Sequence, residues 1–177
     1  GENFWGYQAH GIVPDMMTFA KGVGNGLALG GVVGRAEVME AMPANSISTF
    51  GGNPIASAGA LATINYMLEH DTQKNSKEMG ERLAKGISEA VSDSSVIAET
   101  RGRGLMRAIE TVIPDSIEPN APAAGQLMEA TRAAGLLIGK GGLYGNVIRI
   151  APPMTVTADE IDEGIAILNE AIKDLDN

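Results

Sequence analysis

A lysine near the N-terminus stands where it could act as a nucleophile. Residues 16–20 form a short apolar run of strand type, and Lys21 follows them directly. Glycine then occupies every second position from 22 to 26, and a second apolar run covers residues 29–33. Glycine tolerates positive φ and lets other atoms approach its backbone closely. The pattern therefore predicts a strand, a tight lysine-bearing turn and a second strand.

Two roles are open to Lys21 from the residues alone. Most lysines at strand ends are solvated charges. A neutral lysine amine is also a nucleophile toward carbonyl groups, a role that arginine cannot take because it stays charged. A phosphate cradle is not expected, because the run is neither G-x-x-x-x-G-K-[ST] nor a complete G-x-G-x-x-G and a strand follows it instead of a helix.

An arginine near the C-terminus is suited to bind a carboxylate. Arg149 lies between Ile148 and Ile150, just before Pro152-Pro153. We expect the guanidinium to be buried or half-buried there, and its planar fork then needs a carboxylate partner. That partner is either a structural acid of the protein or a bound ligand.

A threonine precedes a predicted helix start. Thr49 ends the polar stretch 45–49, and Asn53-Pro54 follows as a typical helix cap and first helical residue. The free N–H groups at such a start suit an anion, but they also suit ordinary capping. By itself, Thr49 reads as a loop residue.

Composition excludes several classes of function. The 177 residues carry a formal net charge of −9, which argues against a nucleic-acid partner. No cysteine is present, so thiol catalysis, disulfides and thiolate metal sites are excluded, and His10 and His70 leave little for a metal. Because no long apolar run or signal peptide is visible, we expect a cytoplasmic protein without a membrane partner.

The elements that must position these residues fall into two groups. The first group holds the lysine turn and is followed by three predicted helices, at residues 36–42, 54–68 and 71–92. From residue 96 onward, short strands alternate with helices. The predicted strands cover 96–99, 104–111, 136–138 and 147–150, and the predicted helices cover 121–134 and 158–175. This second group indicates helices packed on a small, mostly antiparallel sheet.

Three ordered segments resemble the class III pyridoxal-phosphate aminotransferases, the group of the ornithine, 4-aminobutyrate and alanine–glyoxylate enzymes. They are Phe4–Gly26, with Phe4-Trp5-Gly6-Tyr7-Gln8, Pro14-Asp15 and Ala20-Lys21-Gly22, then Ser48–Pro54, then Ile148–Pro153. The resemblance implies an α/β fold, the C-terminal part of a fold type I PLP-dependent transferase. Residues 1–75 would end the large cofactor-binding domain, and residues 76–177 would form the small α+β C-terminal domain.

The resemblance also implies a role for each candidate residue. Lys21 would hold pyridoxal 5'-phosphate as an aldimine and move the proton at the substrate Cα. Thr49 would reach the cofactor phosphate of a neighbouring subunit, which implies a homodimer with the active site at its interface. Arg149 would bind the substrate carboxylate. Arg101 and Arg103 have no such match and are expected to be structural or surface charges.

The implied reaction is a ping-pong transamination between an amino acid, alanine-like or an ω-amino acid, and a 2-oxo acid. Because family members are much longer, we expect this chain to lack the N-terminal half of the site and to be inactive alone. Two alternatives stay open. One is another class III enzyme, an aminomutase or decarboxylase, and the other is a non-catalytic remnant that keeps only the dimer and small-domain surface.

Overall fold

The computed structural model describes residues 1–175, which form two compact units. The N-terminal unit is residues 3–71. The C-terminal unit begins at residue 72 and also includes Gly1 and Glu2. In the described range, no helix is both long and apolar enough to cross a membrane.

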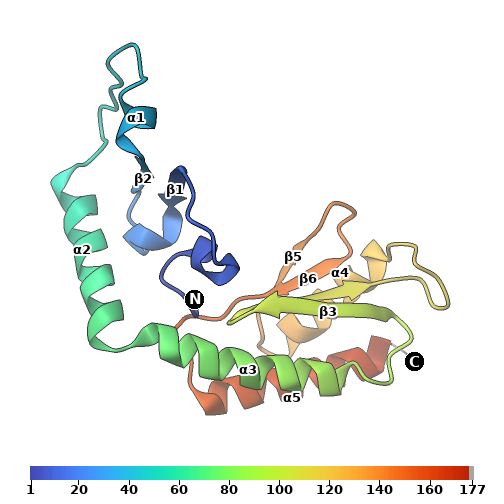
Figure 1. The fold of residues 1–177 in the computed structure, drawn as a ribbon. Helices are drawn as coiled ribbons and strands as arrows, with labels where there is room; N and C mark the ends of the chain where they lie inside the picture. Colours follow the sequence, from blue (N-terminus) through green and yellow to red (C-terminus); the bar gives the residue numbers. More distant parts are fainter. Residues whose placement is uncertain (176–177) are drawn as a thin grey trace. The chain divides into compact units, whose positions relative to one another are not determined.

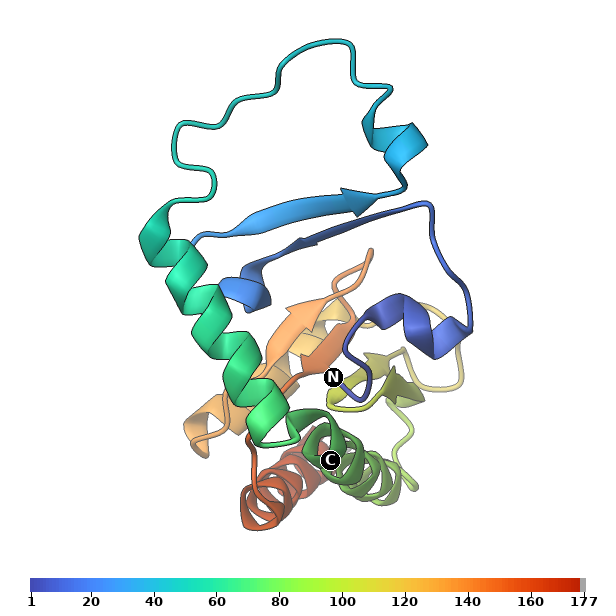
Figure 2. The same cartoon turned by 60° about the vertical axis from the view of Figure 1, so that its left-hand side comes forward.

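The N-terminal unit is built on a two-stranded antiparallel ribbon (Figure 2). Strands β1 (Met16–Ala20) and β2 (Gly30–Gly34) pair along their whole length. The other elements are short helices and one long one: η1 (Gly6–His10), η2 (Lys21–Gly24), α1 (Ala36–Met39) and α2 (Pro54–Glu69). The predicted order of strand, lysine-bearing turn and strand is therefore confirmed.

Helix α2 begins where the sequence predicts. The Asn53 side chain accepts a hydrogen bond from the Ala56 N–H at 3.0 Å, and Pro54 takes the first helical position, where its missing N–H leaves nothing unpaired. Only Ala56 and Ala60 of this helix are buried. Most of its apolar side chains are therefore uncovered within this unit.

The C-terminal unit packs helices against one antiparallel sheet (Figure 1). Its strands are β3 (Ile97–Arg103), β4 (Met106–Thr111), β5 (Gly139–Gly141) and β6 (Val147–Ile150), in the spatial order β3-β4-β6-β5. Its helices are α3 (Thr72–Ala90), α4 (Ala121–Ala133) and α5 (Ala158–Leu175). The predicted α+β layer, with an antiparallel sheet, is confirmed.

The core of this unit lies between the sheet and the helices. Side chains along a strand alternate between the two faces of a sheet. Ile109 of β4 and Ile148 of β6 are fully buried against the helices, where they meet Leu127 of α4 and Leu168 of α5. The neighbours of these two isoleucines point to the other face, which none of the helices described for this unit covers. Among the described residues, that uncovered face carries Arg101, Glu110 and Arg149.

Two predicted strand boundaries are wrong. Strand β3 continues to Arg103 and β4 begins at Met106, so the hairpin turn lies at Gly104-Leu105, whereas the prediction ended the first strand at residue 99 and began the second at 104. Gly102 is part of the strand and packs closely against β4. An added Cβ at this position would come within 2.1 Å of the Met106 carbonyl oxygen.

The predicted strand at 136–138 is also not found, and β5 lies at Gly139–Gly141 instead. Leu136 lies just past the C-terminal end of α4 and is tied to that helix, because its N–H donates to the Thr131 carbonyl at 2.8 Å. The residues that follow it pair with β6 through their backbones, so a segment of glycines and one lysine becomes the edge strand.

Candidate functional site

Lys21 starts the turn that follows β1. Its φ is 57°, a left-handed value that is uncommon for a residue with a side chain. Asn25 at 46° and Gly26 at 102° also have positive φ, whereas Gly22 and Gly24 do not. Of the three glycines in this turn only Gly26 uses the positive φ that glycine tolerates, and the lysine itself carries strain. Strain of this kind concentrates at functional sites.

Backbone hydrogen bonds and packing on α2 hold this turn in place. The Asn25 N–H donates to the Gly22 carbonyl at 3.1 Å and the Leu27 N–H to the Gly24 carbonyl at 3.0 Å. Leu27 packs on α2 so closely that a Cβ on Gly59 would lie 2.3 Å from its Cδ1. Lys21 itself is exposed, and within residues 1–175 its amine has no hydrogen bond or ion pair. The fold thus fixes the backbone of Lys21 and leaves its amine available.

Aromatic rings support the strand that carries the lysine. The rings of Phe4 and Trp5 meet edge to face with centroids 5.0 Å apart, and Trp5 lies 5.9 Å from Phe19 of β1. Phe19 in turn covers Gly31 of β2, where a Cβ would come within 2.4 Å of the ring. These contacts are packing contacts within the N-terminal unit.

Thr49 lies in the exposed loop between α1 and α2. The loop is closed by the Gly51 N–H, which donates to the Ser48 carbonyl at 3.1 Å, and by the Asn53 amide, which donates to the Phe50 carbonyl at 3.0 Å. Asn53 is therefore engaged as a cap. The Thr49 hydroxyl makes no hydrogen bond to any residue that the structure describes.

Arg149 lies on β6, between two strands with small residues. It is opposite Ala108 of β4 and Gly139 of β5. The guanidinium lies over Gly139, since a Cβ at that position would be 3.9 Å from both Nε and Nη2. Arg149 is exposed, so the expectation of a buried or half-buried guanidinium is wrong. Alternation along β6 directs it to the face without helices, and no carboxylate in the described part of the chain pairs with it.

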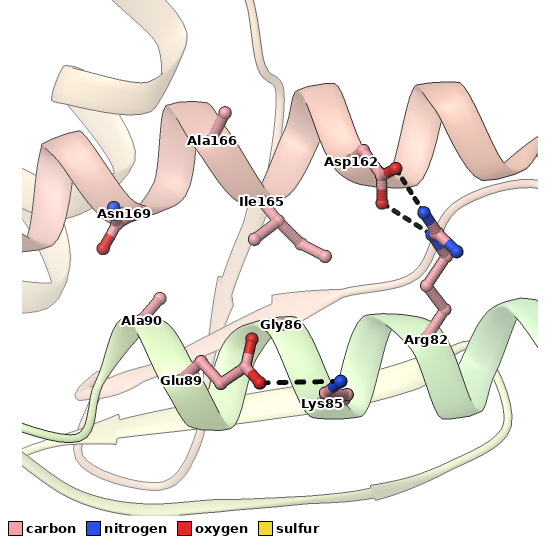
Figure 3. A pocket seen from close by; sticks show the side chains of 9 residues that line it. All are labelled: Arg82, Lys85, Gly86, Glu89, Ala90, Asp162, Ile165, Ala166 and Asn169. Atoms are coloured by element: carbon pink, nitrogen blue, oxygen red, sulfur yellow. Dashed lines mark hydrogen bonds and ion pairs between the residues drawn. The ribbon is translucent and has the colours of Figure 1, made fainter.

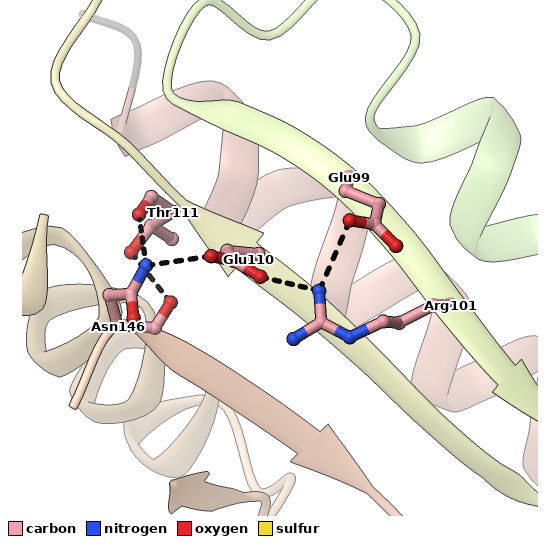
Figure 4. Close-up of polar contacts among 5 residues, drawn as sticks. All are labelled: Glu99, Arg101, Glu110, Thr111 and Asn146. Carbon is pink, nitrogen blue, oxygen red and sulfur yellow. Dashed lines mark hydrogen bonds and ion pairs between the residues drawn. The ribbon is translucent and has the colours of Figure 1, made fainter. Parts of the chain in front are cut away.

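The same sheet face carries a second, fully occupied arginine (Figure 4). Arg101 binds the Glu110 carboxylate and lies 3.4 Å from Glu99. The hydrogen bond from Arg101 holds the pKa of Glu110 below its usual value. Buried Asn146 donates to the other Glu110 oxygen at 3.3 Å and to the Thr111 carbonyl at 2.9 Å. Sequence reasoning did not identify Asn146, because only a contact between distant segments gives it this role.

Arg103, also on β3, pairs with Glu2 at 2.9 Å. Arg101 and Arg103 both form ion pairs within the protein, which agrees with their predicted roles as structural or surface charges.

A groove of about 560 Å³ lies between α3 and α5 (Figure 3). At one end Arg82 binds Asp162 with two hydrogen bonds, which lower the pKa of that carboxyl. Lys85 faces Glu89 at 3.8 Å. Both cations of the groove therefore already have carboxylate partners, and the groove is a weaker candidate for an anionic ligand than Arg149.

The candidate residues are divided between the two units. Lys21 and Thr49 belong to the N-terminal unit, and Arg149 belongs to the C-terminal unit. Neither unit by itself contains all three candidate residues.

Comparison with known proteins extends over nearly the whole chain. The family described as Aminotransferase class-III matches residues 1–172. The alanine–glyoxylate aminotransferase 2 homolog 2, mitochondrial, of Arabidopsis thaliana is 39% identical over 162 residues, which are 90% of this chain and 34% of that protein. The 5-aminovalerate aminotransferase DavT of Pseudomonas putida is 39% identical over 173 residues, which are 97% of this chain and 41% of that protein. This chain thus spans well under half the length of these relatives.

The structure has similar relatives among solved proteins. An aminotransferase of Bacillus anthracis superimposes with a TM-score of 0.90 at 28% identity, covering 98% of this chain and 42% of that one. The predicted α/β fold of a fold type I transferase is confirmed by this likeness.

Proposed function

The chain belongs to the class III aminotransferases, and from this premise we propose that it provides part of the active site of a pyridoxal-phosphate-dependent aminotransferase. The observation that carries the proposal is Lys21, which is held at a φ of 57° on a fixed turn with its amine unpaired among the described residues. The left-handed φ of Lys21 favours a functional role, because backbone strain of this kind concentrates at functional sites, and the unpaired amine is accessible to an aldehyde.

The residues present fit this cofactor. Pyridoxal 5'-phosphate supplies an aldehyde that condenses with amines and a ring that accepts electrons from the substrate. Lys21 would hold the aldehyde end, and the Thr49 hydroxyl would donate to the phosphate. The loop around Thr49 is closed by its own backbone and by Asn53, so its hydroxyl is free for that contact.

Lys21 would also act on protons. Its amine would serve as the general base and acid that takes a proton from the substrate Cα and returns it. The rigid turn behind Lys21 fixes its Cα, so that only the flexible side chain has to move between the two roles.

Arg149 would bind the carboxylate of the substrate. Its guanidinium is exposed above Gly139 and faces no carboxylate of the described residues, so both of its parallel N–H groups are available for a bidentate contact. The amino donor would be an alanine-like or ω-amino acid and the acceptor a 2-oxo acid, with the amino group transferred in two half-reactions of a ping-pong cycle.

We further propose that the N-terminal unit belongs to the end of the large cofactor domain and that the C-terminal unit is the small domain, with a boundary near residue 75. Helix α2 exposes Ile55, Leu61 and Leu68 by 74%, 61% and 62%. Such apolar surface is typical of a contact with further polypeptide. Polypeptide outside this sequence and the second subunit of a homodimer would cover it and complete the site, in which Thr49 would serve the neighbouring subunit.

Covalent trapping tests the proposal. The 177-residue chain and a polypeptide extended to the length of the relatives are incubated with pyridoxal 5'-phosphate, reduced with borohydride and mapped by peptide mass. We expect the pyridoxyl mass on Lys21 in the extended protein and no label in the shorter chain. Lys21→Arg should abolish the label, and Lys77→Arg, an exposed lysine of α3, is the matched control. Label on a different lysine of the extended protein would overturn the role of Lys21.

A further inference from the structure

Glu110 occupies a position between two arginines on the uncovered face of the sheet. Its strand, β4, lies between β3 and β6. Ala108 is paired with Arg101 of β3 on one side and with Arg149 of β6 on the other. Residues paired in this way share a face, and Glu110 lies two positions further along the same face. Glu110 is therefore the diagonal neighbour of both arginines, a separation that long side chains can bridge.

In the structure, Glu110 pairs with Arg101 and not with Arg149. The carboxylate binds Arg101 through one oxygen and accepts from the buried Asn146 amide at 3.3 Å through the other (Figure 4). Arg101 also lies 3.4 Å from Glu99, which is directly opposite Glu110 in the sheet. No described carboxylate pairs with Arg149. Arg101 thus pairs with two carboxylates, whereas the guanidinium of Arg149 has no carboxylate partner among the described residues.

We propose that Arg101, together with Asn146, holds the Glu110 carboxylate away from Arg149 and so keeps Arg149 free for a carboxylate ligand. Arg101 is in this sense a positioning residue, because it acts on the ligand only through Glu110 and Arg149. The inference rests on the proposed function, in which Arg149 receives the substrate carboxylate.

Electrostatics gives the expected behaviour when Arg101 is removed. Glu99 and Glu110 would then face each other as like charges, which is unfavourable across a strand pair. Asn146 contributes a single neutral hydrogen bond to Glu110 and also donates to the Thr111 carbonyl, so it cannot neutralise the carboxylate. The remaining arginine on this face that lies diagonal to Glu110 is Arg149. Ala108, which is opposite Arg149, has a small side chain that does not block the Glu110 carboxylate from reaching Arg149.

Titration of Glu110 tests the competition without any cofactor. Side-chain carboxylate NMR follows the Glu110 pKa in the complete protein and in variants. In Arg101→Met the Glu110 pKa should stay below its ordinary value, because Arg149 takes over the carboxylate, and it should rise only in Arg101→Met/Arg149→Met. A Glu110 pKa that is normal in Arg101→Met and unaffected by the further loss of Arg149 would overturn the proposal.

Kinetics of the cofactor-loaded enzyme tests the consequence. Arg101→Met should raise KM for the carboxylate substrate roughly three- to fivefold, as for loss of an exposed ion pair, with kcat little changed. Arg101→Met/Glu110→Gln should restore KM to within about twofold, because no competing carboxylate is left. Arg103→Met, on the same strand, is the control and should leave KM unchanged.

The outcomes separate the two claims. An unchanged KM in Arg101→Met, or a raised KM that Glu110→Gln does not restore, would overturn the positioning role. If Arg149→Met itself leaves KM unchanged, the proposed function of Arg149 fails, while the titration still decides whether Glu110 moves between the two arginines.

Discussion

Gly80 of α3 lies directly against Gly104 of the β3–β4 turn. A Cβ on Gly80 would be 2.3 Å from the Gly104 carbonyl carbon and 2.4 Å from its oxygen. The carbonyl of Gly80 also accepts a hydrogen bond from Arg107 of β4 at 3.0 Å. The hairpin and the helix therefore meet backbone to backbone, which only glycine allows at position 80.

Replacing Gly80 by alanine should destabilise the C-terminal unit. Alanine favours a helix by up to about 1 kcal/mol over glycine, but here the methyl group meets backbone that cannot rotate away. Overpacking of this kind costs about 1 to 3 kcal/mol. Gly125→Ala in α4 is the matched control, because a Cβ there meets nothing within 4 Å, and it should be neutral or stabilising. Urea unfolding of both variants measures the difference, and equal stabilities would contradict the tight contact.

Asn75 links α3 to the segment that follows β6. Its side-chain amide donates to the carbonyls of Met154 at 2.8 Å and Val156 at 3.0 Å. Asn75→Ala should lower the free energy of unfolding by about 1 to 3 kcal/mol, because two partly buried carbonyls lose their donor. Lys77→Ala, an exposed change on the same helix, should stay within about 0.5 kcal/mol of the wild type. If both variants unfold alike, the two hydrogen bonds contribute nothing measurable.

The start of α5 predicts a dependence of stability on pH. Glu160 accepts from the Thr157 N–H at 2.8 Å and from its hydroxyl at 2.9 Å, and these bonds lower the pKa of Glu160 below the ordinary 4.5. A lowered carboxyl pKa stabilises the folded state above the unfolded value. That stability is lost as pH falls below about 4.5 and through the folded pKa.

Glu160→Gln should keep the capping box but remove this ionisation. The wild type should exceed the variant in stability at neutral pH, and the two unfolding curves should converge as the solution is acidified below pH 4.5. Thermal unfolding from about pH 3 to about pH 7, on both sides of the ordinary glutamate pKa, measures the difference. Curves that stay parallel would show that Glu160 is not stabilised by ionisation.

Local signals account for the parts of the fold that were predicted well. Thr157 as a cap, acidic residues in the first turn and a regular apolar stripe predict α5 with the bounds that the structure gives. Asn53-Pro54 does the same for the start of α2. In both cases the signal lies within a few residues of the feature, so no knowledge of distant contacts is needed.

The misplaced features depend on distant contacts. Strand β5 contains two glycines and a lysine, and it is a strand because β6 pairs with it. The exposure of Arg149 could not be predicted from its apolar neighbours, since alternation separates it from Ile148 and Ile150 but does not say which face the helices cover. Asn146 and Glu110 are 36 residues apart in sequence, and only the fold brings them together. The roles of Lys21, Thr49 and Arg149 were predicted from the resemblance of their segments to a known family. The structure adds that all three residues are exposed and that their side chains have no polar partner among the described residues.

Arg149 gives the most direct prediction about substrate binding. Its guanidinium has no partner among residues 1–175 and lies above Gly139, so a carboxylate can approach both parallel N–H groups. Arg149→Met should raise KM for carboxylate-bearing substrates about 10- to 100-fold, as expected for the loss of hydrogen bonds to a charged group. The KM of Arg149→Lys should lie between those of the wild type and Arg149→Met, because a lysine keeps the charge but loses the bidentate fork.

An amine substrate that has no carboxylate is the control. Its KM should change equally little in both variants, and steady-state kinetics with matched substrates measures this contrast. Equal losses on both kinds of substrate would mean that Arg149 supports the fold of the site and does not bind the carboxylate.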